Sequence, residues 1–202
     1  MPAPKTIDPP MPVVLASASP TRRELLGGLL TRFEVVAPQV DEASVSVDDP
    51  RERAVELARR KAAEVAARRP DALVIGADTL IVCRGDVIGK PADLDDAARI
   101  LHRLSHNPHS VITGVHVIHP DGRSRSACAE AVLRMYPMSA ERIAEYLAGF
   151  DPLHRAGAYA IEADDPNVER LSGSVTGVMG LPMEDVEAML RDLLGAGHGR
   201  PT

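Results

Sequence analysis

The stretch Val13-Val14-Leu15-Ala16-Ser17-Ala18-Ser19-Pro20-Thr21-Arg22-Arg23-Glu24-Leu25-Leu26 passes from a continuous apolar run into a turn and then into a helical pattern. Ser19 can cap the helix, and Pro20 suits its first position because the missing N–H would have no partner there. The free N–H groups of the first turn and the helix dipole favour an anion such as phosphate. An ordinary helix cap has the same appearance, so both interpretations stay open from these residues alone.

Helices and strands alternate along the rest of the chain. The apolar periodicity predicts helices over 20–30, 50–68, 93–104, 139–148 and 182–194. Strands are predicted at 13–17, 33–36, 73–79, 110–119 and 123–135. Turn residues at Arg84-Gly85 and Asp121-Gly122 indicate hairpins, so the class is α/β with a mixed β-sheet flanked by helices. We expect one domain over 13–194, between disordered tails at 1–12 and 195–202.

Composition narrows the function. The chain has 202 residues, enough for one sizeable domain or two lobes around a cleft. A net charge of −6 argues against a duplex-binding surface, and 2% aromatic residues argue against stacking on single strands. We therefore expect no nucleic acid as partner. We also expect no membrane, because no apolar run reaches spanning length and the N-terminus lacks a secretory pattern, so a cytoplasmic location with free Cys83 and Cys128 follows.

Asp78 lies at the end of a buried-looking strand, where a charge is costly unless it is paired, hydrated or bound to metal. If Arg84-Gly85 form the hairpin loop, Cys83 pairs with Asp86, and the ribbon brings Asp78 close to Lys90. A structural salt bridge would explain this pair equally well. Gly76 and Gly89 bracket the two charges and remove side-chain bulk around them, which favours the approach of a ligand.

Two further charged positions, Asp41-Glu42 and Lys61, could be functional or simply exposed to solvent. The adjacent carboxylates Asp41-Glu42 suit a hard divalent cation, although solvated loop acids are common. Lys61 follows Arg59 and Arg60 on the predicted helix 50–68, where most of the basic run is expected to face solvent. Position alone does not single out Lys61.

Eight motifs in order resemble the Maf family, the septum-formation-inhibitor-like nucleotide pyrophosphatases, over residues 13–194. They are Ala16-Ser17-Ala18-Ser19-Pro20-Thr21-Arg22-Arg23-Glu24-Leu25-Leu26, Asp41-Glu42, Lys61-Ala62, Gly76-Ala77-Asp78-Thr79, Gly89-Lys90-Pro91, Thr113-Gly114, Ala156-Gly157-Ala158-Tyr159 and Gly180-Leu181-Pro182. The resemblance implies an elongated mixed sheet with two lobes around a cleft, as in the inosine triphosphatase-like fold. It also implies frequent dimers, so we expect a homodimer.

The same resemblance implies hydrolysis of a nucleoside triphosphate to a monophosphate and pyrophosphate with a divalent metal, Mg²⁺ or Mn²⁺. Asp78 matches the catalytic acid residue that accepts a proton from the attacking water, and Glu42 with Asp78 matches the metal-associated carboxylates. The positions that match phosphate contacts are Ser17, Ser19, Arg22, Lys61 and Lys90. The chemistry is consistent with this assignment, because the reaction needs an oriented water and cations for the departing pyrophosphate.

Three positions resemble the determinants of base specificity: Thr21, Thr79 and Glu162. Thr79 follows the pattern of the dTTP/UTP branch, whereas Thr21 stands where that branch carries Arg, and Glu162 where it carries Gln. An ionised Glu only accepts hydrogen bonds, so Glu162 suits the N1–H and N2–H donors of guanine better than the carbonyls of a pyrimidine. If its side chain faces solvent, Glu162 says nothing about the base. The three positions together predict a slight departure from strict dTTP/UTP use.

Two alternatives remain beside this hypothesis. One is an inosine-triphosphate pyrophosphatase, disfavoured by the Ser-Pro-Thr-Arg-Arg and Gly-Lys-Pro signatures. The other is a nucleotide-binding regulator of cell division without enzymatic activity. The presence of Asp78, Lys90 and Glu42 argues against the regulator, because pure binding needs no residue that deprotonates water.

Overall fold

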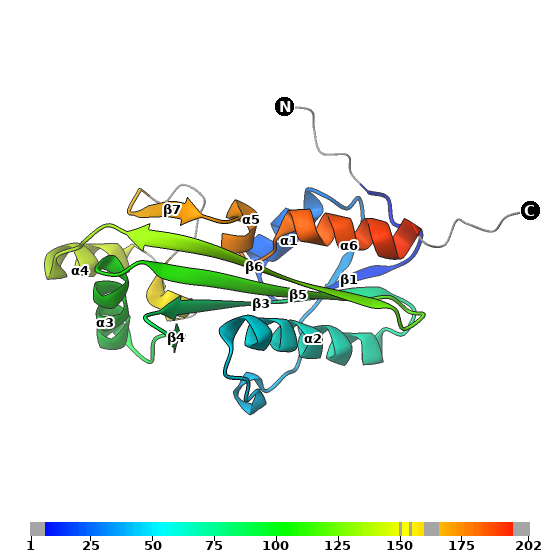
Figure 1. The fold of residues 1–202 in the computed structure, drawn as a ribbon, viewed down its shortest axis with the longest axis horizontal. Helices are drawn as coiled ribbons and strands as arrows, with labels where there is room; N and C mark the ends of the chain where they lie inside the picture. Colours follow the sequence, from blue (N-terminus) through cyan, green and yellow to red (C-terminus); the bar gives the residue numbers. More distant parts are fainter. Residues whose placement is uncertain (1–6, 150, 154, 160–165, 196–202) are drawn as a thin grey trace, which may run out of the picture. The chain divides into compact units, whose positions relative to one another are not determined.

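The computed structural model describes residues 7–149, 151–153, 155–159 and 166–195. The strands are β1 Val13–Ala16, β2 Glu34–Val36, β3 Leu73–Cys83, β4 Asp86–Ile88, β5 His109–Ile118, β6 Ser124–Met135 and β7 Val168–Ser172. They form a seven-stranded sheet in the order β2-β1-β3-β5-β6-β7, with β4 paired to β3 (Figure 1). β1 is parallel to β2 and β3, whereas β3–β4 and β6–β7 are antiparallel, so the predicted mixed α/β sheet is confirmed.

Helices connect these strands. They are α1 Pro20–Gly27, α2 Pro50–Arg68, α3 Leu94–Ser105, α4 Ala140–Ala148, α5 Val175–Val178 and α6 Met183–Gly195, with 3₁₀ turns η1 Glu42–Ser44 and η2 Ala156–Ala158. The chain divides into two compact units. Unit 1 comprises the described residues up to Asp78, Thr113–Cys128 and those from Gly180 onward, and unit 2 comprises Thr79–Ile112 and the described part of Ala129–Met179.

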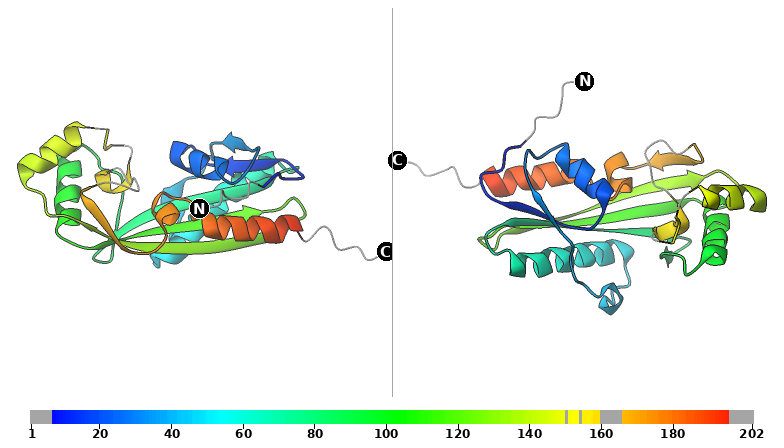
Figure 2. Two further views of the ribbon diagram at one scale, coloured as in Figure 1. Left: turned by 90° about the horizontal axis from the view of Figure 1, so that it is seen from above. Right: turned by 180° about the vertical axis from the view of Figure 1, so that it is seen from behind.

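Unit 1 has three layers, with α2 on one face of its strands and α1 and α6 on the other (Figures 1 and 2). The alternation of strand side chains produces this division. Val13, Leu15, Leu73 and Ile75 pack with α1 and α6 in one cluster. The even-numbered neighbours face α2 in a second cluster, which contains Val14, Ala16, Ala62, Val65, Ala72 and Val74. Even positions of β3 therefore point toward α2.

Unit 2 has its own core between its part of the sheet and the helices α3 and α4. Ile81, Leu101 and Leu133 are fully buried there, together with Tyr159. The Tyr159 hydroxyl lies 2.9 Å from Nε2 of His109, which satisfies a polar tip inside an apolar cluster. The predicted hairpin register is confirmed, because Cys83 pairs with Asp86.

Several boundaries differ from those expected. α1 ends at Gly27 rather than residue 30, since the two successive glycines Gly27 and Gly28 disfavour helix. The Gly28 N–H donates back to the Glu24 and Leu25 carbonyls. The expectation of a loose leader does not hold for residues 7–12, because Ile7 packs on the core of unit 1 and its N–H donates to the Leu29 carbonyl at 2.6 Å. β7 and α5 were not predicted at all.

Other expectations concern the termini and the thiols. Residues 1–6 and 196–202 of the predicted tails lie outside the described residues. Cys83 is buried and Cys128 exposed, and neither forms a disulfide, as expected. None of the helices that the structure describes is both long and apolar enough to cross a bilayer.

Candidate active site

The turn between β1 and α1 is held by its own hydroxyl groups. The Ser19 side chain accepts from the Arg22 N–H at 3.4 Å and caps α1, with Pro20 at the first helical turn as predicted. Ser17 is buried, and its Oγ accepts from the Ser19 N–H at 3.1 Å. Ala16 lies opposite Gly76 in the parallel pair, so this turn begins level with Ala77, the residue before Asp78 on β3.

Arg22 ties this turn to two other segments. Its Nε donates to the Gly180 carbonyl at 2.7 Å and its Nη1 to the Ala77 carbonyl at 2.9 Å. Burial lowers the pKa of the Arg22 guanidinium, and the Asp78 and Glu42 carboxylates oppose that shift. The Gly180 carbonyl had no predicted role. A backbone acceptor leaves no signature in the side-chain pattern, so only the fold reveals it.

Two glycines let α2 lie unusually close to the sheet. A Cβ on Gly76 would lie 2.3 Å from the Ala58 carbonyl oxygen and 2.8 Å from the Ala62 nitrogen. A Cβ on Gly114 would lie 2.4 Å from the carbonyl of Ala54. The prediction that Gly76 clears space for a ligand is therefore wrong, because helix backbone fills that space. Gly89 does face open space, with no atom within 4 Å of such a Cβ.

This close approach brings Lys61 onto Asp78. Nζ of Lys61 lies 2.5 Å from Oδ1 of Asp78 and 2.7 Å from Oε1 of Glu42. Asp78 sits at an even position of β3, facing α2, and only 7% of its side chain is exposed, against 11% for Lys61 and 58% for Glu42. Residues from β3, α2 and η1 thus meet in one cluster within unit 1.

The electrostatic balance at Asp78 favours its neutral form more than in water. Burial raises the pKa of Asp78 above the ordinary value, and this effect outweighs Lys61, which lowers it by charge and by hydrogen bonding. Arg22 lowers the pKa further and Glu42 raises it. A carboxyl group with a raised pKa is suited to accept a proton near neutral pH.

The cluster offers oxygen ligands but no complete metal cage. Within the described ranges, no group of three or more His, Cys, Asp or Glu side chains gathers in a way that could hold an ion. Glu42 and Asp78 nevertheless present two carboxylates to one point, occupied by the Lys61 ammonium. Mg²⁺ is commonly held by one or two carboxylates with substrate phosphates and water, so these two residues fit such an ion.

The remaining predicted residues lie elsewhere along the chain. The β3–β4 ladder ends at the pair Ile81–Ile88, so strand pairing does not extend to Asp78 and Lys90 as the register argument assumed. Lys90 is exposed in unit 2. Thr21 and Thr79 are half-buried, next to the α1 cap and to Asp78 in sequence. Glu162 lies outside the described residues.

Comparison with known proteins agrees with these motifs. The family model for Maf-like proteins matches residues 12–193. A dTTP/UTP pyrophosphatase of Geobacter metallireducens is 42% identical over 184 residues, which cover 90% of this chain and 95% of that protein. A dTTP/UTP pyrophosphatase of Geotalea uraniireducens is 43% identical over 183 residues, covering 89% and 93%.

A solved structure gives a weaker likeness. The nucleoside-triphosphatase / dITP/XTP pyrophosphatase from Mycobacterium abscessus matches with a TM-score of 0.40 and 15% identity, over 62% of this chain and 73% of that one. With so low a TM-score, the assignment rests on the sequence matches alone. On their evidence, the chain belongs to the family of Maf-like proteins.

Proposed function

We propose that this chain hydrolyses nucleoside triphosphates between the α- and β-phosphates. Water attacks the α-phosphorus, and the bond between this phosphorus and the oxygen that bridges to the β-phosphorus breaks. The products are a nucleoside monophosphate and pyrophosphate, which keeps the bridging oxygen. The observation that carries the proposal is the buried Asp78 carboxylate, which is paired with Lys61. Asp78 directly follows Ala77, whose carbonyl accepts a hydrogen bond from Arg22. No covalent nucleophile is needed for this reaction.

Asp78 accepts the proton of the attacking water in this proposal. Its raised pKa brings the carboxylate nearer in basicity to the operating pH, and Lys61 opposes this rise by charge and hydrogen bonding. Lys61 and Arg22 add positive charge near the cluster, and the cap at Ser17 and Ser19 lies at the N-terminus of α1, where an anion is stabilised. We propose that these four residues and Lys90 contact the phosphates of the substrate.

Glu42 and Asp78 are the residues that would hold a divalent cation, Mg²⁺ or Mn²⁺. Their carboxylate oxygens suit such hard ions, and the substrate's phosphates would complete the coordination. When bound, the cation supplies positive charge to the departing pyrophosphate. Lys61 holds the two carboxylates close together, and a bound cation would take the place of its ammonium group between them.

The relatives' names support dTTP and UTP as the leading substrates. Identity above 40% over nine-tenths of the chain weighs more than one side chain of undescribed placement, Glu162. Thr79, which follows the dTTP/UTP pattern, points the same way. We therefore place pyrimidine triphosphates first and retain guanine and deaminated purine triphosphates as competitors.

The test is pyrophosphate release from a panel of pyrimidine, purine, methylated and deaminated nucleoside triphosphates with Mg²⁺ or Mn²⁺. Asp78→Asn is expected to lower kcat by about 10²-fold or more, because a positioned general base contributes that much. Binding of a non-hydrolysable triphosphate should change by no more than a few fold. Pyrophosphate release that persists in Asp78→Asn refutes the role of this residue.

The same panel separates the alternatives. A wild-type chain that binds triphosphates and releases no pyrophosphate would be a nucleotide-binding regulator. Turnover restricted to deaminated purines would instead identify an inosine-triphosphate pyrophosphatase.

A further inference from the structure

The loop between β2 and α2 lies along the side of α2. Three α2 side chains spaced four residues apart hold it: Arg60, Glu64 and Arg68. They reach, in turn, Ser44 Oγ at 3.0 Å, the Gln39 N–H at 3.1 Å and the Ala37 carbonyl at 3.1 Å. Residues four apart share one helix face, so α2 presents a continuous polar row to this loop.

The part of this loop that reaches the proposed site is η1, because it carries Glu42, whose carboxylate contacts Lys61. All three residues of η1 are exposed, so burial contributes little to fixing this turn. Its backbone bonds are long, with the Val45 N–H donating to the Glu42 carbonyl at 3.3 Å, whereas the Ser44 hydroxyl donates to the Asp41 carbonyl at 2.7 Å. Beyond these internal bonds, two side-chain contacts with α2 hold the turn: Arg60 with Ser44, and Lys61 with Glu42.

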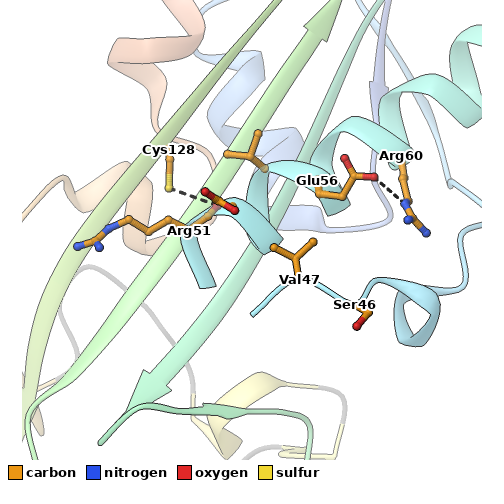
Figure 3. A pocket seen from close by; sticks show the side chains of 8 residues that line it. Ser46, Val47, Arg51, Glu56, Arg60 and Cys128 are labelled. Atoms are coloured by element: carbon orange, nitrogen blue, oxygen red, sulfur yellow. Dashed lines mark hydrogen bonds and ion pairs between the residues drawn. The ribbon is translucent and has the colours of Figure 1, made fainter. Parts of the chain in front are cut away.

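Arg60 is well placed to supply such a contact. Its Nη1 donates to Ser44 Oγ at 3.0 Å. Its Nε donates to Glu56 Oε1 at 2.8 Å (Figure 3). Hydrogen bonds from Arg59 and Arg60 lower the pKa of Glu56 to about 2, so Glu56 stays ionised and keeps hold of the guanidinium. Most of this basic run was expected to face solvent, and the Arg60 side chain is 37% exposed, against 11% for Lys61.

We propose that Arg60 is a positioning residue: by holding Ser44 it fixes η1, so that the Glu42 carboxylate lies at Lys61 beside Asp78. Arg60 and Lys61 are adjacent on α2 and hold opposite ends of the same three-residue turn. Arg60 also lines a cavity of about 500 Å³ with Ser46 and Val47, the residues that follow η1 (Figure 3). The functional consequence rests on the proposed function, in which Glu42 helps to hold the metal.

Arg59 provides a matched control. It is the neighbouring arginine, pairs with the same Glu56 at 2.7 Å and 2.8 Å, and has no described contact with η1. Arg60→Gln and Arg59→Gln thus each remove one charge and one partner of Glu56. Among the described contacts, only Arg60→Gln removes the hold on Ser44.

Amide hydrogen exchange reports how firmly η1 is held, and this measurement does not depend on enzymatic activity. In Arg60→Gln the amides of residues 43–45 should exchange about two- to tenfold faster, the effect expected from the loss of one such hydrogen bond. Arg59→Gln should leave them unchanged. Ser44→Ala removes the acceptor instead of the donor, together with the Ser44 hydroxyl bond to the Asp41 carbonyl, so it should accelerate exchange at least as much as Arg60→Gln. Its agreement in direction guards against a folding defect in the arginine variant.

Calorimetric titration with Mn²⁺ measures the consequence for the metal. Arg60→Gln and Ser44→Ala should bind Mn²⁺ about two- to tenfold more weakly than wild type or Arg59→Gln. Equal exchange, or equal Mn²⁺ affinity, in Arg60→Gln and Arg59→Gln overturns the proposal. A wild-type chain that releases no pyrophosphate refutes the proposed function instead, and neither comparison depends on that result.

Discussion

Gly76→Ala is the substitution whose effect follows most directly from the structure. The added Cβ would lie 2.3 Å from the Ala58 carbonyl oxygen and 2.8 Å from the Ala62 nitrogen, both on the backbone of α2. Ordinary contacts begin at 3.4 Å, so the helix has to move away from β3 by about 1 Å. Backbone atoms cannot rotate aside as a side-chain end can.

Stability and catalysis should both suffer from this shift. Overpacking of a core costs about 1–3 kcal/mol, and two backbone clashes place Gly76→Ala at the upper end. For a chain of this size, about 3 kcal/mol corresponds to a fall in Tm of roughly 6–12 °C. The same shift would stretch the 2.5 Å contact between Lys61 and Asp78 to about 3.5 Å, the limit of hydrogen-bond reach, and a misplacement of about 1 Å can lower kcat by roughly 10²-fold.

Calorimetry and pyrophosphate release measure the two effects on one preparation. Gly195→Ala is the matched control, because nothing lies within 4 Å of a Cβ at that position, and it should leave both quantities unchanged. If Gly76→Ala keeps its Tm within about 2 °C and its kcat within twofold of wild type, the close approach of α2 does not position Lys61.

Two further predictions concern single side chains. Lys61→Gln should move the acidic limb of the kcat/KM profile to higher pH, because Asp78 must be ionised to accept a proton and loses the neighbour that most lowers its raised pKa; a limb that stays in place means that another group is the base. Ser19→Ala should lower the free energy of unfolding by about 0.5–1 kcal/mol in urea denaturation, because the long 3.4 Å cap to the Arg22 N–H is lost; an unchanged midpoint would show that water caps α1 equally well.

Local features of the fold could be predicted from the sequence. The Cys83–Asp86 register follows from a two-residue turn, and the start of α2 follows from Asp49 capping ahead of Pro50. β7 was missed because the sequence Val168-Glu169-Arg170-Leu171 has no strong alternation and its pairing with β6 contains a bulge. The signals that succeed are those that span a few residues.

The site required contacts that no short pattern encodes. Asp78 was assigned Lys90 as its neighbour from hairpin register, whereas the described partner is Lys61, 17 residues earlier in the chain. That contact depends on how closely α2 packs against Gly76 and Gly114, which no local sequence pattern encodes. The resemblance supplied Lys61 as a candidate, and the structure supplied the reason.

Unit 1 is assembled from segments that lie far apart in the sequence, and this has a consequence during synthesis. Its core needs Leu181, Val186, Leu190 and Leu193 from the last segment to cover Leu15 and its neighbours. A nascent chain that has not yet released this segment from the ribosome leaves that apolar face uncovered, and Arg22 lacks the Gly180 carbonyl. A chain that stops before residue 180 therefore lacks both the apolar cover of unit 1 and the carbonyl that holds Arg22 beside Ala77.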